Sequence, residues 1–336
     1  MRLLVTGGCG FIGSNFIRHI LNKYPLYKIV NLDALTYAGN PENLKDLLAD
    51  GRYTFVKGKI EDAALVKSLV GNADYVVHFA AESHVDRSIV DAGPFLLTNV
   101  IGTHIVLAAS REASIKKLIH ISTDEVYGAL GDQGKFTEET SLRPNSPYAA
   151  SKASGDMLVR AYYETYKMPL ITVRPSNNYG PYQFPEKLIP LMITNLLENK
   201  PVPVYGEGLN VRDWLFVEDN CRAIDLVLHE GKIGETYNVG GEAEMRNIDL
   251  VKTVLKIMGK DESLITFVKD RPGHDYRYAL DISRIGRELG WRPSVSIDEG
   301  LQRSIRWFTD NEWWWRPLKE RLASESKGFW TGMQKG

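Results

Sequence analysis

Short apolar runs alternate with longer segments of helical spacing along the first half of the chain. The apolar runs predict strands at residues 3–6, 27–32, 53–57, 75–79, 117–121 and 170–174, and the first is followed by a helix over 11–23. Strands that read as near-continuous apolar runs separated by helices indicate a parallel sheet covered on both faces. We therefore expect a doubly wound α/β fold, in which ligands bind at the carboxyl ends of the strands.

The pattern changes after Pro175, where prolines and glycines become frequent and the helical segments become shorter. This texture predicts a smaller, loop-rich region that closes over the first. A strand over 236–239, followed by Gly240 and Gly241, is expected to return to the main sheet, so the two domains would interleave. The expected division is a main domain over 1–175 with a returning segment near 210–240, a C-terminal substrate-binding domain over 176–209 and 241–318, and a polar helix or loose tail over 319–336.

Composition and charge narrow the class of protein. The 336 residues carry a formal net charge of −1, so no overall basic field attracts nucleic acid or an anionic membrane. Two cysteines, Cys9 and Cys221, cannot form a disulfide framework, which favours a reducing compartment. Met1 is followed directly by a strand-like run rather than a targeting segment, and no apolar stretch is expected to approach the ~20 residues of a membrane span. These features predict a cytoplasmic protein that binds neither nucleic acid nor membrane.

Three glycines, Gly7, Gly10 and Gly13, lie between the first strand and the first helix. In a Rossmann-type fold such a turn lets the backbone approach a dinucleotide pyrophosphate, which then sits on the helix N-terminus. Asp33 closes the second strand, where a carboxylate accepts hydrogen bonds from the adenosine ribose and repels a 2′-phosphate. With no Arg or Lys between Asp33 and Glu42, the sequence predicts NAD rather than NADP. The alternative for Asp33 is a solvated strand end.

A candidate catalytic pair opens the helix after Ser146, a favourable N-cap residue. Tyr148 and Lys152 are four residues apart and share one helix face. An ammonium beside a phenol favours the phenolate, so we expect Lys152 to lower the pKa of Tyr148 from its ordinary ~10. Thr123, Asp124 and Glu125 follow the strand at 117–121, and neighbouring carboxyls there can divide into an acid and a base. The alternative for these three residues is a plain polar end of a strand.

Several motifs together resemble the dTDP-glucose 4,6-dehydratases, in the nucleotide-sugar branch of the extended short-chain dehydrogenase/reductase family. They are the glycine turn, the Tyr148/Lys152 pair, and the segments 81–88 (AESHVDRS), 123–128 (TDEVYG), 177–181 (NNYGP), 210–214 (NVRDW) and 270–275 (DRPGHD). The resemblance runs from Arg2 to about Pro317. Epimerases of this branch usually carry serines where this chain has Thr-Asp-Glu, so Asp124 and Glu125 together are typical of a 4,6-dehydratase.

The resemblance implies a redox-neutral dehydration of dTDP-glucose that uses NAD and no metal, in a homodimer joined through helices near 95–112 and 148–166. It implies catalytic roles for Thr123, Asp124, Glu125, Tyr148 and Lys152. The cofactor contacts that it implies are Gly7, Gly10, Phe11, Ile12, Gly13, Asp33, Ala34, Leu35, Thr36, Ile60, Phe79, Ala80, Ala81, Thr98, Tyr148, Lys152 and Asn178. The substrate contacts that it implies are Ser83, Thr123, Asn177, Lys187, Leu188, Pro203, Tyr205, Arg212, Asn247, Arg271 and His274.

One position departs from the family pattern. Lys59 stands where the family usually has an aspartate that accepts a hydrogen bond from the adenine amine, and an ammonium only donates. The adenine contact then falls to Glu61, Asp62 or the backbone. Other functions remain open at this stage: dehydration of another nucleotide hexose such as UDP-glucose, a UDP-glucose 4-epimerase-like reaction, or a non-catalytic NAD-sensing protein.

Overall fold

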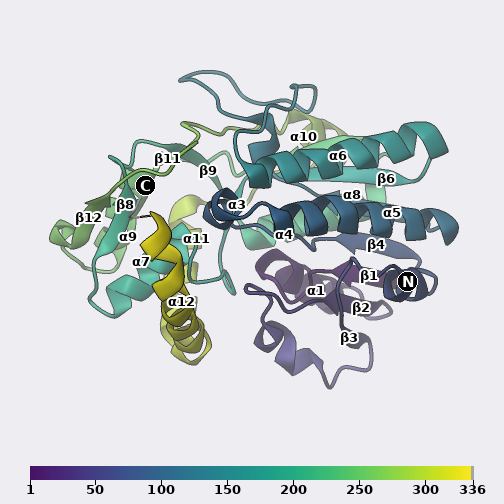
Figure 1. The fold of residues 1–336 in the computed structure, drawn as a ribbon, viewed down its shortest axis with the longest axis horizontal. Helices are drawn as coiled ribbons and strands as arrows, with labels where there is room; N and C mark the ends of the chain where they lie inside the picture. The colour runs from purple at the N-terminus through teal and green to yellow at the C-terminus, as the bar shows by residue number, and fades with distance from the viewer. Residues whose placement is uncertain (334–336) are drawn as a thin grey trace.

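A seven-stranded parallel sheet forms the centre of the protein (Figure 1). The computed structural model describes the backbone of residues 1–333 and the side chains of residues 1–324. The strand order is β10-β6-β5-β4-β1-β2-β3, and all the pairings are parallel. The strands are β1 (Arg2–Thr6), β2 (Lys28–Asp33), β3 (Tyr53–Lys57), β4 (Tyr75–His78), β5 (Lys117–Ile121), β6 (Leu170–Pro175) and β10 (Thr236–Val239). The expected doubly wound fold is confirmed, and its strand order reverses between β1 and β4, where such sheets bind ligands.

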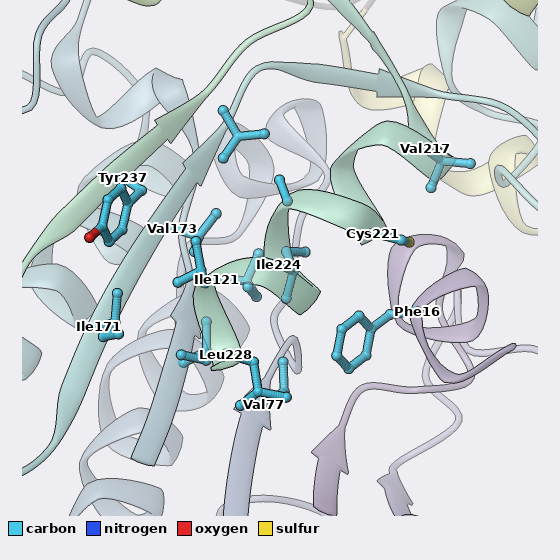
Figure 2. Packing of buried hydrophobic residues seen from close by; sticks show 14 of the residues in the cluster. Phe16, Val77, Ile121, Ile171, Val173, Val217, Cys221, Ile224, Leu228 and Tyr237 are labelled. Atoms are coloured by element: carbon cyan, nitrogen blue, oxygen red, sulfur yellow. The ribbon is translucent and has the colours of Figure 1, made fainter. Parts of the chain in front are cut away.

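Helices cover both faces of this sheet, which explains why its strands are apolar at consecutive positions. Leu3 and Val5 of β1 point to the face covered by α1 (Phe11–Lys23) and α8 (Val217–Glu230), while Leu4 points to the opposite face. Figure 2 shows Phe16 of α1 and Ile224 of α8 packed with strand residues in the first of these two cores. The opposite face is covered by α2 (Ala63–Val70), α5 (Thr103–Glu112) and α6 (Pro147–Tyr166).

A smaller region with its own core lies beside the carboxyl ends of the strands. It holds a three-stranded sheet of β11 (Glu244–Arg246), β9 (Val211–Phe216) and β7 (Asn177–Tyr179), and a pair of β12 (Ile265–Val268) and β8 (Val202–Tyr205). Its helices are α7 (Leu188–Leu197), α9 (Asn247–Ile257), α11 (Ile297–Asp310) and α12 (Glu312–Met333). The shorter helices of the chain are η1 (Pro41–Leu47), α3 (Val85–Val90), α4 (Gly93–Phe95), the π-helix η2 (Leu96–Gly102), η3 (Asp124–Tyr127), η4 (Glu262–Leu264) and α10 (Ser283–Leu289).

The chain crosses between the two regions more than once. After the small sheet receives β9, α8 packs on the main sheet, and β10 pairs with β6 as expected for residues 236–239. The domain boundaries at 175, 209, 240 and 318 remain a prediction. Residues 319–333 continue α12 as a helix, in which Lys319 donates to a Glu198 carboxylate oxygen at 2.6 Å, and residues 334–336 lie outside the described part.

One segment corrects the expectation that no apolar stretch approaches the length of a membrane span. Residues 93–112 form a continuous 20-residue helix, through α4, η2 and α5, with a mean hydropathy of 1.3 in its most apolar window. Its apolar residues divide between two surroundings. Phe95, Val106 and Leu107 are buried in the fold, whereas Leu96 and Ile101 are exposed on the surface. By length and composition this helix could cross a membrane, but 44% of its most apolar 18-residue stretch is buried inside the protein.

A buried carboxylate ties α1 to α8 on the sheet. Asp225 of α8 accepts hydrogen bonds from His19 Nε2 at 2.8 Å, Lys23 Nζ at 2.7 Å, Tyr24 Oη at 3.0 Å and His229 Nδ1 at 2.9 Å. Burial alone would raise the pKa of Asp225, but these donors outweigh it and hold the pKa well below its ordinary value. The same contact raises the pKa of His229.

We expect Asp225→Asn to lower the free energy of unfolding by about 2–3 kcal/mol near pH 6, because it removes the charge that the surrounding cations share. Because the pKa of Asp225 is depressed in the folded protein, its contribution to the free energy of unfolding is present above about pH 4. Because the pKa of His229 is raised, the contribution of His229 is complete only below about pH 6.5 and is lost at higher pH. Urea unfolding of both proteins should therefore give a difference that shrinks as the pH rises through the pKa of His229. Asp46→Asn, which breaks a surface pair with Arg18, is the control and should change stability little. A difference that grows toward pH 9 would contradict this account.

Candidate active site

A cavity of about 580 Å³ opens at the carboxyl ends of the parallel strands. Its lining comes from the glycine turn, the loops after β2, β3, β4 and β5, the segment 94–98, the start of α6, and residues 175–187. Segments far apart in the sequence therefore meet where the strand order reverses.

The glycine turn has no room for side chains. Gly7 has a φ of +74°, and a Cβ at this position would lie 2.6 Å from the backbone nitrogen of Ala80. A Cβ on Gly13 would lie 2.4 Å from the carbonyl oxygen of Gly7. Gly10 is the N-cap of α1 and makes no side-chain cap, so no side chain competes with an anion at the first turn of this helix. The turn fits a dinucleotide diphosphate.

Asp33 lies beside this turn at the end of β2. Its two carboxylate oxygens accept hydrogen bonds from the backbone nitrogens of Cys9 and Leu35, each at 2.8 Å. Burial raises the pKa of Asp33, and these two bonds oppose the rise. Each oxygen keeps a further lone pair for a ribose hydroxyl, and Asp33 also lines the cavity.

The predicted cofactor residues converge on this cavity. Sixteen of them line it: Gly7, Gly10, Phe11, Ile12, Gly13, Asp33, Ala34, Thr36, Ile60, Phe79, Ala80, Ala81, Thr98, Tyr148, Lys152 and Asn178. Leu35 is not among the lining residues, and its backbone nitrogen is bonded to Asp33. The glycine cradle, the uncapped helix start and the carboxylate together fit NAD. Among the described residues, no group of three or more His, Cys, Asp or Glu side chains is arranged for a metal ion.

The two candidate carboxyls stand at the end of β5, in the short helix η3. The hydroxyl of Thr123 caps this helix by accepting from the Glu125 nitrogen at 3.3 Å, and it donates to Asp124 Oδ1 at 3.2 Å. Asp124 is 2% exposed, and its Oδ2 has no partner among the described residues. Burial and then the neighbouring charge of Glu125 raise the pKa of Asp124 well above its ordinary value. Asp124 is therefore suited to carry a proton.

Glu125 has different electrostatic surroundings. Burial raises its pKa, but the charges of Arg271, Arg212 and Lys187 oppose the rise, with Arg271 having the largest such effect. The pKa of Glu125 stays raised, but its carboxylate has three cations in its favour, whereas the pKa of Asp124 is raised well above its ordinary value. Of the two groups, Glu125 is therefore better suited to act as the base and Asp124 as the acid.

Tyr148 contradicts the expectation that Lys152 lowers its pKa. Burial raises the pKa of Tyr148 far above its ordinary value, and the negative charge of Glu125 adds to the rise, while a hydrogen bond with Thr123 opposes it. Lys152 Nζ instead donates to the carbonyl oxygen of Ile121 at 2.6 Å. The shared helix face brings Tyr148 and Lys152 to one cavity, but the desolvation of the phenol exceeds any help from the ammonium.

The residues that surround Lys152 on the side away from the cavity were not predicted from the sequence. Burial lowers the pKa of Lys152 to about 8, and the charge of Asp156, one helical turn along α6, opposes this. Asp156 is itself buried, and its Oδ2 accepts a hydrogen bond from Arg174 Nε at 2.8 Å. Its Oδ1 lies 3.3 Å from His120 Nε2. Two features of the sequence could have indicated them: Lys152 and Asp156 are four residues apart on one helix, and His120 and Arg174 are polar residues inside apolar strands. The cavity-lining carboxylates Glu82 and Glu186 and the phenol of Tyr37 were also missed.

The predicted substrate residues divide into two groups. Ser83, Thr123, Asn177 and Lys187 line the cavity, and Lys187 Nζ donates to the carbonyl oxygen of Ser83 at 3.2 Å. The others are not among its lining residues: Leu188, Pro203, Tyr205, Arg212, Asn247, Arg271 and His274.

Several of this second group still cluster at one edge of the smaller region. Arg271 Nη1 lies 3.4 Å from Asp86 Oδ1, and the hydroxyl of Tyr205 donates to Asp86 Oδ2 at 3.3 Å. The rings of Tyr205 and His274 are 6.1 Å apart. Arg212 is buried, and its guanidinium lies 4.4 Å from the ring centre of Tyr278. Because the charges of Arg212 and Arg271 lower the pKa of Glu125, this cluster lies next to the part of the site that holds Asp124 and Glu125.

Comparison with known proteins gives consistent matches over nearly the whole chain. The family model described as GDP-mannose 4,6 dehydratase matches residues 4–304. The chain is 50% identical to a dTDP-glucose 4,6-dehydratase of Xanthomonas campestris, over 93% of this chain and 94% of that protein.

Two solved structures extend this result. A dTDP-glucose 4,6-dehydratase of Streptomyces venezuelae, solved with NAD and TYD bound, is 52% identical with a TM-score of 0.93, over 95% of this chain and all of that one. A UDP-glucose 4-epimerase of Thermotoga maritima, solved with UDP-glucose, is 29% identical with a TM-score of 0.87, over 93% of this chain and all of that one.

Proposed function

The chain belongs to the dTDP-glucose 4,6-dehydratases of the extended short-chain dehydrogenase/reductase family, and we propose that it converts dTDP-glucose to dTDP-4-keto-6-deoxyglucose. The reaction is an NAD-dependent dehydration without net oxidation. The observation that carries it is the pair Asp124 and Glu125 in the cavity that holds Tyr148. Burial raises the pKa of both carboxyls, and the charges of three cations oppose the rise at Glu125, which makes Asp124 the acid and Glu125 the base.

The first step requires removal of the proton of the sugar 4-hydroxyl, and we assign this to Tyr148. Thr123 hydrogen-bonds the 4-oxygen from the end of β5. Bound NAD supplies the acceptor for the C4 hydride, the donor that later returns it to C6, and a positive charge that favours the Tyr148 phenolate. Lys152, in the same cavity, adds a further cation that holds the cofactor end of the site.

The second step is elimination across C5 and C6. The ketone at C4 makes the neighbouring C5 proton acidic, and the Glu125 carboxylate removes it. Asp124, held in the acid form by burial, donates its proton to the departing 6-hydroxyl, which leaves as water. Once C6 has received the hydride, Glu125 returns its proton to C5, which gives the 4-keto-6-deoxy sugar. The proton that Tyr148 took from the 4-hydroxyl replaces the one that Asp124 gave up. A ketone must form before elimination, which explains why a redox cofactor serves a reaction with no net oxidation.

The nucleotide end of the substrate fits the cluster at the edge of the smaller region. Arg212 and Arg271 suit a diphosphate because a guanidinium binds phosphate oxygens in pairs. Ser83, Asn177, Lys187 and Asn247 offer polar groups to the sugar and the phosphates, with Leu188, Pro203, Tyr205 and His274 around the base. In this scheme residues 176–209 and 241–318 form the substrate-binding domain, and residues 1–175 with the returning segment near 210–240 form the NAD-binding domain.

Three rival functions differ from this one in their products. A 4-epimerase shares the scaffold, but the structure solved with UDP-glucose is less similar to this chain than the dehydratase is, 29% against 52% identical. A dehydratase for UDP-glucose would have the same carboxyl pair, and its substrate would carry uracil in place of thymine. A protein that only binds NAD, without catalysis, does not require Tyr148, Lys152 and both carboxyls in one cavity.

We also propose that the protein is cytoplasmic and works as a homodimer joined through α5 and α6. These two helices lie side by side, as Figure 1 shows. Helix α6 and the π-helix η2, which leads into α5, expose apolar side chains, including Ile101 at 48% and Met157 at 59%. Exposed apolar side chains gathered on neighbouring helices are typical of a protein interface, and one here would cover the apolar side of the 93–112 helix.

The proposed reaction can be tested with dTDP-, UDP-, CDP- and GDP-glucose, following the 4-keto-6-deoxy product by its absorbance in alkali. We expect dTDP-glucose to give the highest kcat/KM. With dTDP-glucose deuterated at C4, the label should reach the new methyl group, because the hydride that leaves C4 returns to C6. Product with no label in its methyl group would contradict the proposed cycle, and a galactose/glucose exchange would indicate an epimerase.

We expect Glu125→Gln to reduce product formation by about 10²-fold or more, because an amide cannot remove the C5 proton. Oxidation at C4 should continue, since the variant also removes the charge that raises the pKa of Tyr148. Single-turnover absorbance of the reduced cofactor, beside steady-state product assays, separates the two steps. Glu42→Gln, in an exposed pair with Lys45, is the control. Ordinary product formation by Glu125→Gln would refute its role as the base.

The dimer can be tested with Met157→Glu, which places a charge on the proposed apolar interface. Sedimentation velocity should show a dimer for the wild-type protein and a monomer for the variant. Leu26→Glu, at an apolar side chain that is 85% exposed elsewhere on the surface, should stay dimeric. A wild-type monomer, or a variant dimer as stable as the wild type, would exclude this interface.

A further inference from the structure

The loop after β3 forms the far end of the cofactor cavity. β3 pairs with β2 on the side away from β1, so this loop lies beyond Asp33, the predicted ribose ligand, as seen from the glycine turn. The backbone nitrogen of Gly58 donates to the carbonyl oxygen of Asp33 at 3.0 Å, which fixes the two loops together. Lys59, Ile60 and Glu61 of the loop line the cavity. A base attached to a ribose at Asp33 therefore reaches these three residues.

The three residues offer different chemistry to a purine base. Ile60 is buried and supplies an apolar surface for the ring. The Lys59 ammonium only donates hydrogen bonds, whereas the exocyclic amine of adenine is also a donor. The carboxylate of Glu61 only accepts. Glu61 is therefore the member of this loop whose side chain matches the amine.

Packing holds Glu61 in place for this contact. The hydroxyl of Thr98, on the π-helix η2, donates to Glu61 Oε1 at 2.7 Å, and Thr98 also lines the cavity. Gly102 of the same π-helix gives room to Ile60, since a Cβ on Gly102 would lie 2.5 Å from Ile60 Cδ1. Both contacts join the loop to η2, so the orientation of the Glu61 carboxylate is set before any ligand arrives. Its remaining lone pairs stay available as acceptors.

The neighbouring carboxylate is committed elsewhere. Asp62 Oδ1 caps helix α2 by accepting from the backbone nitrogen of Leu65 at 3.0 Å, and Asp62 is not among the lining residues. Glu82, which does line the cavity, is hydrogen-bonded to Thr36 in the loop after Asp33 rather than to the loop after β3. We propose that Glu61 selects the adenine of the cofactor by accepting a hydrogen bond from its exocyclic amine, an inference that rests on NAD as the cofactor of the proposed function.

The test compares NAD with nicotinamide hypoxanthine dinucleotide, in which an oxygen replaces the amine. Dissociation constants are measured by calorimetric titration of the full-length protein after bound nucleotide has been removed. The wild-type protein should bind the hypoxanthine analogue at least about tenfold more weakly, because the carboxylate then faces an acceptor. In Glu61→Gln, whose amide also donates, the two constants should come within about threefold of each other.

Asp62→Asn is the matched control, since it makes the same chemical change one residue away and asparagine caps a helix as well as aspartate does. It should keep the wild-type preference. Thr98→Val, which removes the hydroxyl that orients Glu61, should reduce the preference without changing the charge of the site. A Glu61→Gln protein that keeps the full preference, or a wild-type protein that binds both dinucleotides equally, would overturn the inference. A wild-type protein that binds neither would instead refute NAD as the cofactor.

Discussion

Burial of ionisable groups at the ends of β5 and α6 is the constraint on which the activity depends. Asp124, Glu125, Tyr148 and Lys152 all lie in one cavity with little water to solvate a charge, and desolvation is the largest cause of each pKa shift. Such burial favours the neutral form of every one of these groups. The cations beside Glu125 and the charge of Asp156 beside Lys152 then favour the charged form of some groups but not of others. Nearby charges oppose the effect of burial to a different extent at each group, so one group can act as an acid while another acts as a base.

The main sheet places these groups without contributing chemistry of its own. Parallel strands bring the ends of β1, β2, β3 and β5 to one edge, where the glycine turn, Asp33, the Lys59–Glu61 loop and the carboxyl pair all meet. The smaller region, which lies beside this edge, contributes Arg212 and Arg271 to the surroundings of Glu125. The cofactor end therefore rests on the backbone of one region, and the substrate end depends on side chains contributed by both.

Features that depend on a local rule could be predicted from the sequence, whereas those that depend on the folded surroundings of a residue could not. The alternation of apolar strands and helices predicted the sheet, and the spacing of Tyr148 and Lys152 placed both residues in one cavity. The same spacing predicted a lowered pKa for Tyr148 and was wrong, because a local pair contains no information on desolvation. The helix at 93–112 was not recognised as long and apolar enough for a span because polar residues such as Asn99 and His104 interrupt its apolar run.

The amino-acid sequence by itself determined the doubly wound fold, the dinucleotide turn and the candidates for the reacting side chains, because periodicity, glycine spacing and side-chain chemistry are local properties. The tertiary structure alone decided how the pKa values of those side chains shift, which carboxylate of the loop after β3 lines the cavity, and which cations act on Glu125. These properties depend on distance and on exclusion of water, and residues as distant along the chain as Glu125 and Arg271 acquire them only when the chain folds.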